Sequence, residues 1–195
     1  MYNSKFYSFI QLDRKNHINV VNRFLKPQAD NRILEIGCGR GYTLKRVQKF
    51  APQAIGIDVN GEAIRRGVVS GLYEMDAQEL EFPDESFDKV YSFHTIEHLP
   101  DVRKALNEIE RVLAPQGKAL LVYPAEPIRG LLAGFAATAL LKNPLRGRDI
   151  HLHKLSPKII EALIIDSRLR HLESKFSLFT PQYFTLLEKS VANER

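Results

Sequence analysis

The sequence predicts an α/β protein whose mostly parallel sheet is covered by helices on both faces. Two observations predict this class. Between residues 32 and 124, short apolar runs typical of buried strands alternate with segments of helical periodicity. Strands separated by helices pair in parallel, because each helix returns the chain to the same end of the sheet. Near the C-terminus, "LRHLESKFSLF" and "YFTLLEKSVA" read as two strands around Thr180-Pro181, and we expect an antiparallel hairpin at one sheet edge.

The first predicted helix lies near the N-terminus. Ile18, Val21, Phe24 and Leu25 recur at helical spacing, and the pattern ends before Pro27. This spacing predicts one apolar face that packs against the sheet.

Polar residues mark the starts of the later helices. Asn60, Asp101 and Ser156 are predicted N-caps, and Pro157 suits a first helical position. The expected strands are 32–36, 54–59, 72–75, 87–94 and 118–124, and the expected helices are 42–50, about 60–70, 102–113 and one starting at 156.

The composition is that of an ordinary globular protein. Of the 195 residues, 44% are hydrophobic and 26% are charged, so one domain can bury a sizeable core. The single cysteine, Cys38, excludes an internal disulfide and suits a reducing compartment. The first residues have no signal-peptide core, and no apolar run reaches the ~18 residues of a membrane span. We therefore expect a cytoplasmic protein.

The net charge of +5 is unevenly distributed. Residues 1–30 hold five Lys/Arg against two acids, residues 31–141 thirteen against fifteen, and residues 142–195 ten against six. Basic flanks attract anionic partners, although a solvated face is the simpler explanation. Because no dense basic tract with interleaved aromatics occurs, we expect no nucleic-acid partner.

The alternating pattern breaks after Pro124. Residues 125–155 read as an insertion within the single domain 1–195, where they form a lid over an acceptor site. Within it, "IRGLLAGFAATALL" (128–141) carries one charge, Arg129, and is too short to span a bilayer.

This apolar segment is followed by a basic cluster. Lys142, Arg146 and Arg148 come directly after it, a combination that suits an amphiphilic substrate or a membrane surface. The alternative is a helix buried against the sheet. The sequence thus predicts an apolar or lipid-like acceptor and peripheral membrane contact through 128–148.

A glycine-rich turn follows the first strand of the alternating region. In "ILEIGCGRGYTL", Glu35 precedes Gly37, Gly39 and Gly41. Such turns let a ligand approach the backbone closely at the carboxyl ends of the strands. The spacing differs from the dinucleotide pattern Gly-x-Gly-x-x-Gly, and no triphosphate-binding Gly-Lys-Ser/Thr follows. Glu35 would repel a pyrophosphate but suits a cationic ligand such as S-adenosylmethionine, which has a sulfonium and an ammonium.

Two further acids stand near the ends of the next two strands. Asp58 ends the second strand, where a carboxylate can accept hydrogen bonds from ribose hydroxyls. Asp76 follows the third strand, where it can accept from an adenine amino group, while the Ala77 N–H can donate to the ring. Either aspartate alone would read as a cap or turn residue. Three acids in series favour a nucleoside site.

The ordered set of motifs resembles class I S-adenosylmethionine-dependent methyltransferases, of the group that includes ubiquinone and menaquinone biosynthesis methyltransferases. The resemblance rests on "LEIGCGRG", "GIDVN", "MDAQELEFPDESFDKVYSFHTIEHLPD" and "EIERVLAPQGKALLVYP". It implies a Rossmann-like fold with seven strands, the last antiparallel, and S-adenosylmethionine as cofactor with S-adenosylhomocysteine as product. The implied cofactor contacts are Glu35, Gly37, Cys38, Gly39, Gly41, Asp58, Val59, Asp76, Ala77 and Phe93.

His94 is the candidate catalytic residue, at the end of the fourth strand. A general base is needed only where the acceptor must lose a proton. His94 can serve as that base or as a wall of the cofactor pocket, and both roles remain open. Glu97 and His98 stand next to it, and for His98 a structural role is favoured.

His151, His153 and Arg148 are the candidate substrate contacts. His151 and His153 would share one face of an extended segment. Metal binding is conceivable, but without neighbouring acids or cysteines a substrate or surface role is favoured, and we expect no metal.

Other classes are disfavoured by residues that the chain lacks. Nucleic-acid amino methyltransferases have an Asn/Asp-Pro-Pro-aromatic step where this chain has "SFHTIEH". Magnesium-dependent catechol-type enzymes need carboxylates at the end of the fourth strand, whereas Asp88 lies at its start. A non-catalytic cofactor-binding protein and an NAD-dependent oxidoreductase remain as alternatives, the second opposed by the glycine spacing and Glu35. The acceptor atom and the oligomeric state are not predicted.

Overall fold

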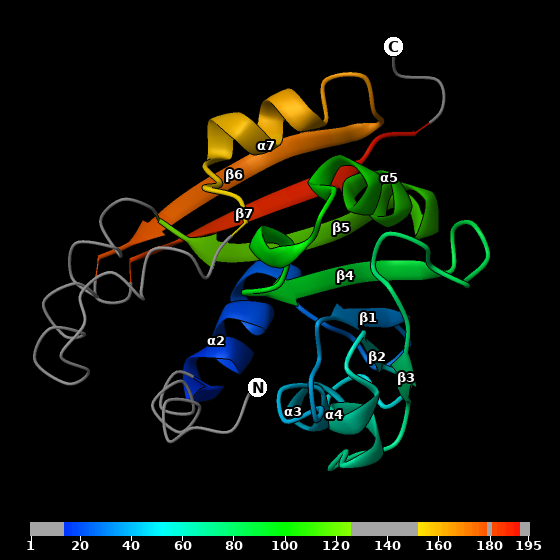
Figure 1. Cartoon of the computed structure of the whole chain (residues 1–195). Coiled ribbons are helices and arrows are strands. Elements are labelled where there is room, and N and C mark those ends of the chain that lie inside the picture. Colours follow the sequence, from blue (N-terminus) through cyan, green and yellow to red (C-terminus); the bar gives the residue numbers. More distant parts are fainter. Residues whose placement is uncertain (1–13, 126–151, 179–180, 192–195) are drawn as a thin grey trace, which may run out of the picture.

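The computed structural model describes residues 14–125, 152–178 and 181–191 (Figure 1). Its strands are β1 Ile33–Ile36, β2 Ile55–Asp58, β3 Leu72–Glu74, β4 Phe87–Phe93, β5 Leu113–Pro124, β6 Leu169–Ser177 and β7 Gln182–Lys189. Its helices are α2 Arg14–Leu25, α3 Leu44–Val47, α4 Gly61–Arg65, the 3-10 turn η1 Ile96–His98, α5 Val102–Val112 and α7 Pro157–Leu163.

The described strands form one seven-stranded sheet in the order β3-β2-β1-β4-β5-β7-β6. The first five strands of this order pair in parallel. β7 lies antiparallel between β5 and β6, so the C-terminal hairpin stands at one edge, as predicted. The α/β class and the antiparallel last strand are thereby confirmed.

Helices cover both faces of the sheet, as the alternating pattern predicts. Figure 1 shows α5 and α7 on one side and α2 on the other. One apolar cluster packs α5 and α7 on the sheet, with Ile109 and Ile160 fully buried. The second cluster packs α2 and α3 on the opposite face, with Val21 and Val47 fully buried.

The predicted caps are present at three helices. The Asn60 side chain accepts from Glu62 N and Ala63 N at the start of α4. Asp101 accepts from Lys104 N at α5, and Ser156 accepts from Ile159 N at α7.

Three predicted boundaries differ from the structure by several residues. The helix expected over about 60–70 ends already at Arg65 in α4. The helix expected over 42–50 has only four α-helical residues, because i→i+3 bonds such as Phe50 N to Val47 O wind the flanking turns more tightly. The strand expected at 118 begins instead at Leu113, directly after α5. Residues 114–117 form an irregularity inside β5, because Leu113 pairs with Phe87 and Lys118 with Lys89.

No helix in the described ranges is long and apolar enough to cross a membrane. Residues 126–151 lie outside the described residues, and with them most of the predicted lid 125–155 and all of segment 128–148 with its basic cluster.

Candidate functional site

The glycine loop joins β1 to α3 at the carboxyl end of the sheet. Gly37 N and Cys38 N both donate to Ile57 O, at 2.8 and 2.9 Å. These two bonds hold the start of the loop against the end of β2.

Glycine is required for different reasons at positions 37 and 39 of this loop. Gly37 has φ +76°, and a Cβ there would lie 1.9 Å from Thr95 Oγ1. Gly39 also has positive φ, +54°, yet a Cβ there would meet no atom within 4 Å. The chain therefore needs a small residue at Gly37 for its own packing, whereas Gly39 faces open space. This is the arrangement expected where a ligand lies against the backbone.

Asp58 links the glycine loop to the next loop. Its Oδ2 accepts from Gly39 N at 2.7 Å, and its Oδ1 accepts from Asn60 N at 2.8 Å. A carboxylate offers about four lone-pair sites, so Asp58 retains capacity for ribose hydroxyls. This residue therefore both shapes the loop and can hold a ligand.

Glu35 lies beneath the loop, 4% exposed, opposite Tyr91 across β1 and β4. The Tyr91 hydroxyl donates to Glu35 Oε2 at 3.0 Å. Burial and the neighbouring Glu35 carboxylate raise the pKa of Tyr91 well above its usual value, so the phenol remains a donor. A buried carboxylate here favours the binding of a cationic group nearby.

Cys38 is buried within the loop. Burial, followed by the charges of Glu35 and Asp58, raises the pKa of its thiol strongly. The thiol therefore stays protonated and forms part of the wall rather than a nucleophile.

The third group of predicted residues follows β3. Met75 N donates to Asp58 O at 3.1 Å, which ties this segment to the end of β2. Asp76 is exposed and accepts from Gln78 N at 2.9 Å, while Ala77 is buried. Val59, next to Asp58, is 73% exposed and offers an apolar surface for a flat ring.

The loop that carries Asp76 is held by a charged network on α5. Arg111 donates to Leu80 O and Phe82 O, and it forms an ion pair with Glu108 at 2.8 Å. Glu108 in turn accepts from Leu80 N at 2.7 Å. The adenine-side loop thus rests on a partly buried Arg–Glu pair.

The end of β4 closes the site on the side towards β5. His94 has φ +51°, unusual for a residue other than glycine, and its N–H donates to Val122 O at 2.8 Å. Its Nε2 lies 2.9 Å from Gln182 Oε1, and its Nδ1 lies 3.6 Å from Glu97 Oε1. A strained backbone held by several partners is typical of functional sites.

Glu97 is the most deeply buried acid of this region, at 1% exposure. Within the described residues neither of its carboxylate oxygens has a hydrogen-bond partner. His94 and His98 lie 3.6 and 3.8 Å from the same oxygen. This carboxylate can orient the His94 ring.

The comparisons with known proteins agree with this geometry. Residues 34–121 match the family described as "Methyltransferase domain". Residues 34–121 therefore carry a methyltransferase domain.

Two curated relatives are similar to part of the chain. The uncharacterized methyltransferase YcgJ of Bacillus subtilis is 34% identical over 113 residues, covering 52% of this chain and 45% of YcgJ. A phosphatidylethanolamine N-methyltransferase of Cereibacter sphaeroides is 31% identical over 125 residues, covering 58% and 61%. The matched part of the chain thus spans about half the length of these relatives.

Solved structures agree on the fold. The crystal structure of the [4+2]-cyclase SpnF has a TM-score of 0.74 at 16% identity, covering 93% of this chain and 83% of SpnF. Because a cyclase shares the fold, the fold alone does not assign the reaction.

The structure brings the cofactor-site residues predicted from the sequence to the carboxyl ends of the parallel strands. Glu35 lies in β1, and the glycine loop follows this strand. Asp58 ends β2, Asp76 and Ala77 follow β3, and Phe93 ends β4.

The substrate residues predicted from the sequence are only partly placed. His151 and Arg148 lie outside the described residues. His153 N donates to Glu97 O at 3.1 Å, and its Nε2 lies 2.9 Å from Leu99 O. His153 therefore anchors the returning chain on the loop after η1. No three His, Cys, Asp or Glu side chains in the described ranges are arranged to hold a metal.

Sequence reasoning missed two residues of the candidate site. His17 of α2 is buried and stacks on Phe93, with ring centroids 4.0 Å apart. Its spacing from Val21 and Phe24 places it on the apolar helix face, which is a detectable signal. Gln182 comes from the distant β7, and nothing local in the sequence links it to His94.

Proposed function

We propose that this chain transfers the methyl group of S-adenosylmethionine to an apolar or lipid-like small-molecule acceptor. Methyl transfer is supported by the arrangement of Glu35, the open backbone at Gly39 and Asp58, which lie together at the carboxyl ends of β1 and β2. Bound S-adenosylmethionine would supply an activated methyl group on a sulfonium. The described residues fit this cofactor, because the buried Glu35 carboxylate suits its cationic groups and the exposed Val59 offers an apolar surface for its adenine ring.

We assign His94 to the acceptor side of the site. His94 follows β4, whose neighbours in the sheet are β1 on one side and β5 on the other. An acceptor hydroxyl or amine must lose a proton as its oxygen or nitrogen forms the new bond to carbon. His94 would accept that proton, and Glu97 would stabilise the resulting imidazolium through Nδ1 at 3.6 Å.

The lipid-like acceptor is supported by two observations. The apolar segment 128–141 and the basic residues that follow it come after β5 in the sequence, and the end of β5 accepts a hydrogen bond from His94 N through Val122 O. The relative from Cereibacter sphaeroides is named for a phospholipid substrate. We propose that segment 125–155 covers the acceptor and contacts a membrane surface. We also propose that the chain belongs to the group of ubiquinone and menaquinone biosynthesis methyltransferases.

The test is transfer of labelled methyl from S-adenosylmethionine to a total lipid extract, followed by phase partition. We expect label in the organic phase. Label only in the aqueous phase would contradict a lipid-like acceptor, and cofactor binding with no transfer to any extract would favour a non-catalytic binding protein.

Kinetics of His94→Ala and Glu97→Gln separate the roles at the acceptor side. If His94 is the base, kcat should fall by about 10²–10⁴ in His94→Ala while the affinity for S-adenosylhomocysteine is retained. Glu97→Gln keeps the shape but removes the charge, so kcat should fall and its pH profile should shift. If His94 is only a wall, kcat and cofactor affinity should fall together and modestly.

A further inference from the structure

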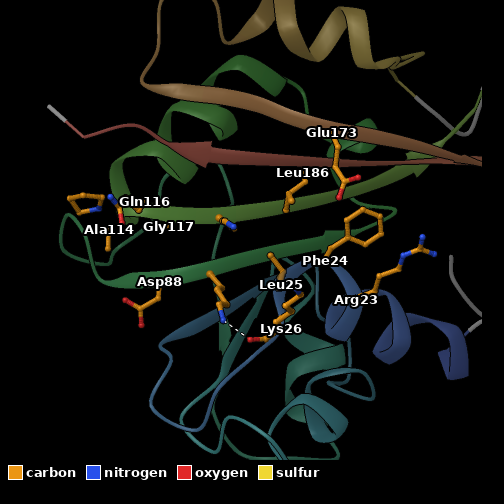
Figure 2. A pocket seen from close by; sticks show the side chains of 13 residues that line it. Arg23, Phe24, Leu25, Lys26, Asp88, Ala114, Gln116, Gly117, Glu173 and Leu186 are labelled. Carbon is orange, nitrogen blue, oxygen red and sulfur yellow. Dashed lines mark hydrogen bonds between the residues drawn. The ribbon is translucent and has the colours of Figure 1, made fainter. Parts of the chain in front are cut away.

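A cavity of about 490 Å³ lies at the opposite end of the strands from the candidate cofactor site (Figure 2). The end of α2, the start of β4 and residues 114–117 of β5 line it. Lys89 in this wall is five residues before His94, about 16 Å along the strand. The cavity is therefore separate from the proposed methyl-transfer site.

Two lysines stand side by side in the wall of this cavity. Lys89 of β4 and Lys118 of β5 are direct neighbours in the parallel register. Both lie on the sheet face covered by α2, since Tyr91 and Leu120, two residues further along each strand, belong to the α2 cluster. Like charges directly opposite each other destabilise a sheet unless a counter-charge is present.

The electrostatics of Lys89 agree with this arrangement. Burial lowers the pKa of Lys89, and the charge of Lys118 lowers it further against the opposing effect of Asp88. The Lys89 Nζ donates to Lys26 O at 2.9 Å and to the Asn31 side chain. These bonds fix the ammonium in place and leave one of its three donors for a ligand.

Two more cations stand at the rim, on the last turn and end of α2. Figure 2 shows Arg23 and Lys26 at the cavity beside Phe24. The Arg23 guanidinium lies 5.9 Å from the centroid of the Phe24 ring. Four basic side chains thus line one cavity.

The acids of the lining are already paired with cations outside it. Asp88 binds Arg32 at 2.7 Å, and Glu173 binds Lys175 at 3.0 Å. Lys118 faces Glu188 only at 3.8 Å, and Arg170 contacts the same carboxylate more closely, at 2.8 Å. The cavity therefore retains an excess of positive charge.

We propose that this cavity binds a phosphorylated ligand, with its phosphate between Lys89 and Lys118 and with Arg23 and Lys26 at the entrance. The apolar part of the wall, Phe24, Leu25 and Leu186, would contact the group that carries the phosphate. A soluble phosphate ester and a phospholipid headgroup share this chemistry. The proposal does not depend on the methyl-transfer reaction.

Calorimetry and thermal unfolding with inorganic pyrophosphate test the soluble source at constant ionic strength. We expect Tm to rise by about 3–6 °C at a tenfold excess over Kd. Lys118→Met should weaken binding about tenfold to a hundredfold. Because it removes one of two like charges, this variant should be at least as stable as the wild type without pyrophosphate. Lys158→Met, an exposed change on α7, is the matched control and should bind normally.

Flotation with phosphatidic acid vesicles, compared with phosphatidylcholine vesicles, tests the headgroup source. Binding to phosphatidic acid that Lys118→Met weakens and Lys158→Met does not would identify a lipid headgroup. Arg23→Gln, at an exposed helix position, gives a second variant that leaves the sheet intact. The proposal is overturned if neither pyrophosphate nor phosphatidic acid binds. It is also overturned if Lys118→Met and Arg23→Gln bind these probes as well as Lys158→Met does.

Discussion

Replacing Asp58 with alanine should affect both folding and cofactor binding. The side chain accepts from Gly39 N at 2.7 Å and from Asn60 N at 2.8 Å, so Asp58→Ala leaves two backbone donors without their carboxylate. Bonds to a charged acceptor contribute about 1.5–3 kcal/mol each, less where water screens them, so we expect a loss of about 2–4 kcal/mol. For a chain of this size the loss corresponds to a Tm decrease on the order of 5–15 °C.

The same change should weaken S-adenosylhomocysteine binding about tenfold to a hundredfold, because the ribose hydroxyls lose a charged partner. Thermal unfolding and calorimetry measure the two effects separately. Asp76→Ala should lose affinity with little change in Tm, since its described side-chain bonds are local ones to Gln78. Asp166→Ala, a remote exposed change, should alter neither quantity. A folded Asp58→Ala protein that binds S-adenosylhomocysteine as well as the wild type would refute the reasoning.

Three further predictions follow from individual residues. Gly39→Val should cost only about 1–2 kcal/mol in backbone strain yet abolish calorimetric binding of S-adenosylhomocysteine. Gly37→Ala should instead disrupt the loop, because the added methyl group would clash with the Thr95 side chain. Wild-type binding by Gly39→Val would contradict the assignment of the open space at Gly39 to the ligand. The Arg111 hydrogen bond is the main cause that lowers the pKa of Glu108. The stabilisation by the ionised Glu108 is complete above its unfolded pKa of about 4.3 and is lost as the pH falls through its lower folded pKa. Glu108→Gln should therefore have a lower Tm than the wild type at pH 7, and this difference should disappear below about pH 4. A difference that persists at low pH would show that the charge of Glu108 is not its cause. The double variant Leu131→Asp/Leu132→Asp should keep S-adenosylhomocysteine binding but lose methyl transfer to lipid extract; unchanged transfer would exclude the apolar segment from acceptor binding.

The sheet could be predicted from the sequence because its strands carry strong local signals. β1 and β2 read as short apolar runs bounded by turns, and Asn60, Asp101 and Ser156 marked the starts of their helices. The helix ends were less predictable. Around α3, an N–H group that bonds the carbonyl three residues earlier gives 3-10 winding, and one that bonds the carbonyl four residues earlier gives α winding, a choice that the sequence pattern does not show. The early start of β5 was hidden by Pro115 and Gly117, which form an irregularity within the strand rather than the loop before it.

The cofactor side of the site was also more predictable than the acceptor side. Its residues follow successive parallel strands, whose carboxyl ends must meet at one edge of the sheet. The partners of His94 come instead from η1 and from β7, 88 residues further along the chain, and only tertiary packing brings them together. The cationic cavity likewise depends on the register between β4 and β5, which a single irregularity sets.

Backbone amide NMR during titration with S-adenosylhomocysteine tests the central claim most directly. The account predicts that the amide signals of Gly39, Asn60 and Ala77 shift together along one saturable curve, while that of Lys118, at the other end of the strands, does not move. The account would be contradicted if none of the three signals shifted at saturating ligand, or if the shifts gathered at Lys118 instead.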